Sequence, residues 1–222
     1  MVVVVVVVVA TFVARASAQP APAEPDATGV ELGVRAGYAL PAGDREGMQP
    51  LGRTAEGAVP LTLDVGYRVT PNLFVGALLS YAFLRLDKVA LFCDRQPVDG
   101  PADCSGTAIR IAADARWQVP LGGSYAAWVE AGAGLEWMTI HYEPGGFSPN
   151  PSDVDYRGFE LAHLEVGAGS RIASRLVAGP FASAGLGQFR TTQITGQTSR
   201  ELTDKTLHGW VTFGVRAMYT AP

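Results

Sequence analysis

Lysine is almost absent from this chain. Only Lys88 and Lys205 occur among the 222 residues, although Lys and Arg together number 17. The surfaces of ordinary soluble domains carry lysine in quantity, so the sequence predicts an outer surface of another kind. The basic residues are also dispersed and the formal net charge is −4, which excludes the basic patch of a nucleic-acid-binding protein.

Long apolar runs are lacking as well, except for a short one at the start. Residues 2–14 are apolar apart from one threonine, whereas a membrane-spanning helix needs about 20 apolar residues and a signal-peptide core about 10 to 14. Ala16-Ser17-Ala18 then supplies the A-x-A cleavage pattern. We therefore expect a signal peptide over residues 1–18 and a proline-rich, disordered linker over residues 19–28. The alternative is a tethered N-terminal helix.

Cysteine occurs only twice, at Cys93 and Cys104, which bracket the stretch CDRQPVDGPADC. A zinc site would need further Cys or His ligands nearby, and this stretch contains none. In an exported chain such a pair is most simply a disulfide, with two free thiols as the alternative. Closing a loop of this size would stabilise the fold by about 3 kcal/mol in the chain-entropy model.

Period-two alternation of apolar and polar residues is what the chain has in abundance. It predicts strands, each of about the 9 to 11 residues that a tilted strand needs to cross a bilayer. The segment 177–189 is glycine-rich and interrupted by Pro180, which predicts a bulge or a late strand start. The eight segments are 29–40, 59–69, 73–84, 107–119, 125–140, 161–172, 177–189 and 207–219.

The connections alternate between long and short. The long ones are 41–57, 85–106, 141–158 and 190–206, and the short ones are 70–72, 120–124 and 173–176. Residues 29–219 are therefore predicted to form one all-β domain, an eight-stranded antiparallel up-and-down transmembrane β-barrel. Outer-membrane barrels have this layout, with long extracellular loops and short periplasmic turns.

Alternation alone does not say which face is inside, because a soluble ligand-binding barrel has the same period. The polar face is rich in glycine and in charges of both signs, while the apolar face carries aromatic residues near strand ends, as aromatic girdles require. We therefore expect the apolar face to contact lipid in the bacterial outer membrane. The aromatic residues are Tyr38, Tyr67, Tyr81, Phe83, Trp117, Trp137 and Tyr219.

This pattern resembles the small eight-stranded outer-membrane barrels of the OmpA and OmpX type. The resemblance covers the whole predicted domain and rests on its pattern and layout. Such barrels usually end in an aromatic residue that the assembly machinery reads; here Tyr219 is in phase with the last strand, and Thr220-Ala221-Pro222 follow it. The resemblance implies outer-membrane lipid and the barrel assembly machinery as partners, and a monomer.

The polar face carries six acids and six arginines, so the signs balance. An eight-stranded barrel is just wide enough inside to be filled by side chains, and an unpaired buried charge would cost several kcal/mol. Arginine suits pairing with carboxylates because it is planar and bidentate. We expect a charge-paired plug, with a gated ion path as the alternative. The inward charges are Glu31, Arg35, Asp64, Arg68, Arg110, Asp114, Arg116, Glu130, Glu136, Glu165, Arg171 and Arg216.

Catalytic residues, cofactors and metals are not predicted. Glu130 and Glu136 could mimic an acid/base pair, but such carboxylates usually pair with arginines. His163 near Glu165 suggests the site of outer-membrane lipid A deacylases, which needs a serine close to a histidine on the lipid-facing wall, and the residues around His208 offer none.

The third long connection offers three acids that could help to bind a cation, namely Glu143, Asp153 and Asp155. Their spacing is not that of a calcium loop, so solvated loop acids are the better interpretation.

The predicted function is that of a non-enzymatic outer-membrane protein whose extracellular loops act in membrane integrity, surface interaction or adhesion and hold any extracellular ligand. The first alternative is a conduit for small hydrophobic molecules of the OmpW type, or a narrow pore. A conduit predicts an apolar, partly open lumen, against which the charged interior argues. A lipid-modifying enzyme is the third interpretation.

Overall fold

The computed structural model describes residues 28–47, 49–87, 91, 93, 103–143 and 151–221. The predicted signal peptide and almost all of the predicted linker lie outside these residues. Within them, no helix combines the length and apolar character that a membrane-spanning helix needs.

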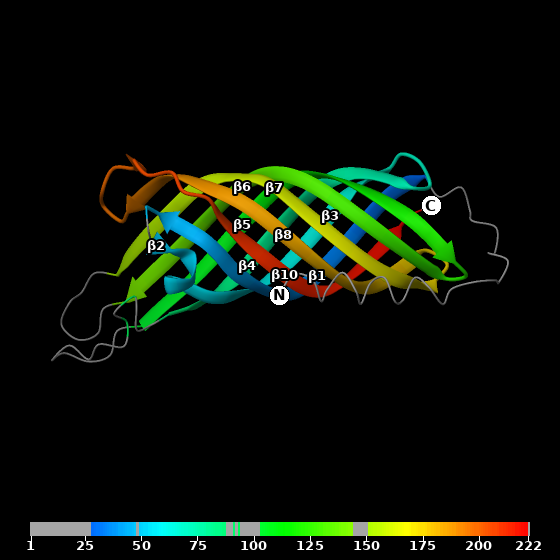
Figure 1. Ribbon diagram of the computed structural model, residues 1–222, viewed down its shortest axis with the longest axis horizontal. Coiled ribbons are helices and arrows are strands. Elements are labelled where there is room, and N and C mark those ends of the chain that lie inside the picture. The colour runs from blue at the N-terminus through cyan, green and yellow to red at the C-terminus, as the bar shows by residue number, and fades with distance from the viewer. Residues whose placement is uncertain are drawn as a thin grey trace.

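Eight long strands form a closed ring in which each pairs antiparallel with its neighbours (Figure 1). This confirms the predicted eight-stranded antiparallel barrel. The strands are β1 (Gly29–Glu46), β3 (Ala55–Arg68), β4 (Leu73–Leu86), β5 (Asp103–Gly122), β6 (Tyr125–Glu143), β7 (Ser152–Ala173), β8 (Leu176–Ile194) and β10 (His208–Thr220). The short strands β2 (Gln49–Pro50) and β9 (Arg200–Glu201) and the 3₁₀ helix η1 (Leu51–Arg53) belong to the long connections.

The ring closes between the first and last strands, where β1 pairs with β10 from Glu31↔Thr220 to Gly43↔His208. The short turns between β3 and β4, β5 and β6, and β7 and β8 gather at one end, at the right of Figure 1. The described parts of the long connections lie at the other end, at the left. We call the short-turn end the lower end and the other the upper end.

Seven of the eight strands are longer than the sequence predicted, up to 22 residues in β7, while β10 has the 13 residues predicted for it. The predicted long connections are therefore wrong in part. β1 continues to Glu46, β6 continues to Glu143, and β7 begins at Ser152. In these upper extensions the outward side chains are polar, as at His141 and Asp153. The alternation that predicts the strands therefore changes there, while the strand pairing continues.

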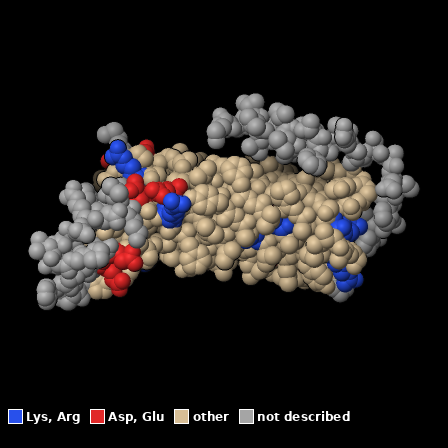
Figure 2. All heavy atoms as spheres, turned by 90° about the horizontal axis from the view of Figure 1, so that it is seen from below, with Lys and Arg blue, Asp and Glu red and all other residues tan. Residues whose placement is uncertain are grey.

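The outer wall between the two ends is apolar. Tyr67 is 52% exposed, Trp117 48% and Phe83 53%, and aliphatic side chains around the ring are exposed to a similar degree. Figure 2 shows that charged side chains gather near the two ends and that uncharged side chains cover most of the wall between them. Exposed apolar surface on this scale must be covered by something other than water.

A bulge in β7 changes which side chains face the lumen. The register against β8 shifts between Glu160 and Ala162, so Leu161 and Ala162 both lie on the outer face. Above the bulge the phase is inverted, which turns Glu160 and Tyr156 inward, where both are buried. The predicted inward phase of this strand therefore holds from His163 toward the lower end only.

Candidate functional site in the lumen and at its upper rim

Buried charges fill the lumen toward the lower end, and we call this set the lower network. It draws five carboxylates and four guanidiniums from β1, β3, β5, β6, β7 and β10. Its members are Glu31, Arg35, Asp64, Arg68, Asp114, Arg116, Glu130, Glu165 and Arg216. The strands place these side chains inward because each occupies the polar phase of its alternation.

Arg35 stands at the centre of the lower network. Its Nη1 lies 2.5 Å from Glu165 Oε2 and 2.8 Å from Glu130 Oε1. Its Nε and Nη2 both donate to the carboxylate of Asp64. Arg216 on β10, the Cα partner of Arg35, contacts the same three acids, with Nη2 3.2 Å from Asp64 Oδ2 and Nη1 2.6 Å from Glu165 Oε1 and 2.7 Å from Glu130 Oε2. The two arginines thus hold carboxylates from three strands together.

Two further pairs of the lower network meet at Glu31. Arg68 Nη2 lies 2.5 Å from Glu31 Oε2, and Arg116 Nη2 donates to Oε1. Arg116 also packs over the ring of Phe74, with its Cζ 4.4 Å from the ring centroid. Each oxygen of Glu31 therefore has its own guanidinium partner, as a buried carboxylate requires.

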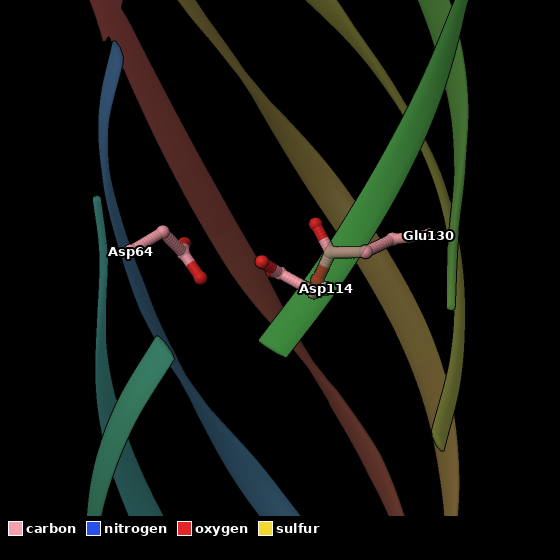
Figure 3. Close-up of side chains that lie close together, drawn as sticks. All are labelled: Asp64, Asp114 and Glu130. Atoms are coloured by element: carbon pink, nitrogen blue, oxygen red, sulfur yellow. The ribbon is translucent and has the colours of Figure 1, made fainter. Parts of the chain in front are cut away.

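Three carboxylates of the lower network lie close together. One oxygen each of Asp64, Asp114 and Glu130 lies within 4.8 Å of the others, and all three residues are buried. Figure 3 shows the three side chains reaching toward one another from separate strands. We call them the carboxyl trio. The oxygens of Asp114 and of Glu130 have no hydrogen-bond partner among the described residues, but Glu130 lies 2.7 Å from Arg216 Nη1, whereas the nearest cation to Asp114 is Arg35 Nη2 at 3.8 Å.

Two further polar groups lie above the lower network. Glu136 accepts from Trp210 Nε1 at 3.1 Å and lies 2.9 Å from His208 Nε2. Glu160 accepts from Arg110 Nη1 at 2.9 Å and has His163 Nδ1 at 3.4 Å. The buried acids therefore number seven, the six predicted ones and Glu160. The β7 bulge thus adds Glu160 to the six predicted acids, so the buried acids outnumber the six arginines predicted for the lumen.

The upper part of the lumen is apolar. Leu51 of η1, Leu202 of the last long connection, and Cys93 are at most 1% exposed, and they pack with inward side chains of the strands. We call this set the upper apolar cluster. Its other buried members are Ala39, Ala55, Ala58, Ala82, Leu86, Cys104, Ala108, Met138, Ile140, Tyr156, Phe189 and Trp210. The disulfide predicted from the sequence, Cys93–Cys104, is present and lies in this cluster.

The upper rim joins the first and last long connections. Asp44 N donates to Leu207 O at 3.0 Å, Thr206 Oγ1 donates to Asp44 O at 3.0 Å, and Arg200 Nη2 lies 3.4 Å from Glu46 Oε1. Further along, the hydrogen bond from Lys205 Nζ, 2.5 Å long, lowers the pKa of the exposed Glu201 carboxyl. Backbone and side-chain bonds thus hold these segments over the barrel mouth.

The other predicted residues are placed as follows. Arg171 is half-buried at the lower end, where its N–H donates to Ser124 O at 2.7 Å. His163 contacts Glu160 and, at 4.0 Å, Glu130, and not the Glu165 that the hydrolase interpretation paired it with.

The three acids considered for a cation have other surroundings. Asp153 lies 2.5 Å from His141 Nδ1, and Asp155 accepts from Thr139 Oγ1 at 2.7 Å. Among the described residues, the carboxyl trio is the only group of three with metal-ligand spacing, so Glu143, Asp153 and Asp155 form no such group.

Sequence reasoning missed Glu160, and the signal for it was weak. The neighbouring Leu161 and Ala162 are two consecutive small or apolar residues in an otherwise alternating strand, which is what a bulge leaves in a sequence. The residues of the upper apolar cluster that come from η1 and the connections carried no periodic signal.

The geometry defines the class of protein. A closed eight-stranded antiparallel barrel with an apolar, aromatic-bearing wall and a polar lower lumen is the architecture of small outer-membrane barrels. The wall cannot face water and the lumen cannot face lipid. The protein is therefore an outer-membrane β-barrel, located in the bacterial outer membrane.

Solved structures share this fold. A major outer membrane protein from Thermus thermophilus is similar with a TM-score of 0.50 and 11% identity, over 86% of this chain and 98% of that one. Ail of Yersinia pestis, solved with the heparin analogue sucrose octasulfate, has a TM-score of 0.48 and 9% identity over 86% and 99%. Neisserial surface protein A has a TM-score of 0.47 and 14% identity over 86% and 97%. No protein-family model and no curated protein matches the sequence.

Proposed function

We propose that this protein is a non-enzymatic outer-membrane barrel whose lumen is closed and whose upper surface carries its function. That function is contact with an extracellular ligand, in surface interaction or adhesion, or a contribution to membrane integrity. The observation that carries the proposal is the filling of the lumen, with the lower network below and the upper apolar cluster above.

Burial at both levels supports a closed lumen. Arg116 and Arg216 are at most 1% exposed within the lower network, and Leu51 and Leu202 are at most 1% exposed within the upper apolar cluster. An ion entering from above would have to displace the packed apolar side chains, and then to separate ion pairs whose exposure would cost several kcal/mol.

The distribution of exposed charge supports a role for the upper rim. Acidic and basic side chains gather at the upper end of the barrel, at the left of Figure 2, beyond the apolar wall. In outer-membrane barrels the long connections face the outside of the cell. In this orientation the first and last long connections, which contain the Arg200–Glu46 and Lys205–Glu201 ion pairs, face the exterior of the cell.

Planar-bilayer conductance of the purified barrel tests closure. We expect no steady current from the parent and a detectable current from Glu130→Ala, which removes a partner of Arg35, Arg116 and Arg216 and creates polar free volume. The matched control is Glu56→Ala, whose ion pair with Arg85 lies on the outer surface. A steady current in the parent would refute closure and favour a conduit.

A conduit for small hydrophobic molecules is the second candidate. The apolar character of the upper lumen favours it, because such molecules would be accepted there in place of the packed side chains. This candidate predicts faster entry of an apolar fluorescent probe into vesicles that contain the barrel. Equal entry with and without the protein, together with a silent conductance record, would exclude it.

Catalysis on membrane lipid is tested separately. Both buried histidines lie against carboxylates, His208 against Glu136 and His163 against Glu160, which suits ion pairing inside the lumen. We expect lipid A from cells that produce the protein to be chemically unchanged in its mass spectrum. A new lipid A species that disappears in His163→Gln would refute the non-enzymatic assignment.

A further inference from the structure

The neighbouring arginines do not fully neutralise the negative charge of the carboxyl trio. Asp64, Asp114 and Glu130 bring three carboxylate oxygens within 4.8 Å of one another in a buried site. Like charges at such distances repel strongly where water is excluded. The lower network as a whole sets five carboxylates against four guanidiniums.

The contacts of the trio are unequal. Asp64 accepts hydrogen bonds from Arg35 Nε at 3.2 Å and Arg216 Nη2 at 3.2 Å. Glu130 lies 2.7 Å from Arg216 Nη1 and 2.8 Å from Arg35 Nη1. The side chain of Asp114 is fully buried, and like those of Glu130 its oxygens have no hydrogen-bond partner. Unlike Glu130, it has no short ion pair, because its one ion-pair contact among the described residues is 3.8 Å long. The charge of Asp114 is therefore the one that the site stabilises least.

We propose that the carboxyl trio binds one proton, which Asp114 carries as a neutral carboxylic acid. The O–H of Asp114 then donates toward a neighbouring carboxylate of the trio, so one proton removes a repulsion and supplies the missing donor. Closely spaced carboxylates share protons for this reason. The inference rests on the closed lumen proposed above, because water in the lumen would solvate all three groups.

The surroundings of the trio favour a proton over a metal ion. Arg35 contacts all three carboxylates, and Arg116 and Arg216 both reach Glu130. A divalent cation within the trio would place two positive charges at short range from these guanidiniums. A proton brings one positive charge, which neutralises one carboxylate.

His163 is the other group that could hold the extra proton. Its Nε2 lies 4.0 Å from Glu130 Oε1, and its Nδ1 lies 3.4 Å from Glu160 Oε2. A protonated His163 would act on Glu130, which already has two short ion pairs, and would leave Asp114 without a donor. The remaining charged neighbours of the trio are Glu31 and Glu165, which Arg68, Arg116, Arg35 and Arg216 hold.

Infrared spectroscopy of the folded barrel tests the proposal directly. At neutral pH we expect the C=O band of a neutral carboxylic acid in the parent, shifted when aspartate carries a ¹³C-labelled carboxyl carbon and absent in Asp114→Asn. The control variant Asp155→Asn, on the upper outer surface, should keep the band. Absence of the band in the parent, or its persistence in Asp114→Asn, would overturn the proposal.

The pH dependence of urea unfolding provides a second readout. If the folded barrel binds one proton more than the unfolded chain at neutral pH, its free energy of unfolding falls as the pH rises. We expect Asp114→Asn to remove this slope and His163→Gln to keep it. Loss of the slope in His163→Gln would place the extra proton on His163. Stabilisation of the parent by Na⁺ or Ca²⁺ at constant pH, abolished in Asp114→Asn, would indicate a metal ion in the trio. Either result would overturn the proposal.

Conductance of the same samples separates the two proposals. A conducting parent that keeps the acid band would refute the closed lumen alone. A silent parent without the band would refute the proton site alone.

Discussion

Arg216 on β10 reaches across β8 to Glu165 on β7, with Nη1 2.6 Å from Oε1. Both strands pair with β8, whose residue at this level is Ser183, the Cα partner of Glu165 on one side and Thr212 on the other. The ion pair therefore ties together two strands that share no backbone hydrogen bonds.

The first prediction concerns this bond. Arg216→Ala should lower the free energy of unfolding by about 3 to 5 kcal/mol, the range for removing one partner of a buried pair, because Asp64, Glu130 and Glu165 all lose a donor. Urea unfolding in detergent measures the change. Arg85→Ala is the matched control, since that arginine is 72% exposed beside Glu56 and should cost at most about 1 kcal/mol. Equal losses in the two variants would contradict the network.

The second prediction is that the Cys93–Cys104 bond stabilises the upper end without being needed for the barrel. Alkylation of the unreduced protein should label neither cysteine in the mass spectrum, and alkylation after reduction and unfolding should label both. Replacing both by serine should cost about 3 kcal/mol by the loop-closure estimate. The variant should still show the folded band in unheated gels, because neither residue takes part in the β1–β10 closure. Labelling of both thiols without reductant would refute the bond.

The third prediction concerns export and lies outside the described residues. Ala16 and Ala18 occupy the small-residue positions of a cleavage site, so the protein extracted from membranes should begin at Gln19. N-terminal sequencing measures this directly. Detection of the valine tract in the membrane-extracted protein would show that the first segment is retained as a tether.

The strands and their faces could be predicted from the sequence because lipid outside and charge inside impose opposite characters on alternate residues. Arg35, Asp64 and Glu130 were assigned to the lumen on that ground, and all three are buried there. The same rule failed at the upper extensions. Around His141 the outer face meets water and the inner face is apolar, as in a soluble protein, so the sequence pattern predicts a connection there.

The partners of the charges could not be predicted, because the chain brings them together from distant positions. Arg35 and Glu165 are separated by 130 residues, and their contact depends on the ring closing with one particular register. The sequence pattern does not place Glu160 in the lumen, because a one-residue bulge in β7 inverts the inward–outward alternation above it. Leu51 and Leu202 belong to non-periodic segments, whose burial depends on where the connections fold.

The last prediction tests how Gly187 on β8 packs against the Glu136–His208 pair above the lower network. Gly187 faces the lumen beside the Glu136–His208 pair, and a Cβ there would lie 2.7 Å from His208 Nε2 and 2.9 Å from Glu136 Oε2. Both side chains are buried on all sides, so neither can withdraw without breaking their 2.9 Å contact. Gly187→Ala should therefore lower the free energy of unfolding by about 1 to 3 kcal/mol, the usual cost of overpacking a filled interior.

A matched control separates this clash from the general effect of replacing glycine. Gly52 in η1 meets only Pro41 Cγ, at 3.9 Å from an added Cβ, so Gly52→Ala should change the stability by no more than about 0.5 kcal/mol. The double variant Gly187→Ala with His208→Ala removes the nearer obstacle, and its loss should be smaller than the sum of the two single losses, because the added methyl group then occupies space that the imidazole has left. Urea unfolding of the four variants in one detergent gives all of these values. Additive losses, or a Gly187→Ala variant as stable as the parent, would show that the Glu136–His208 pair is not packed against β8 in this way.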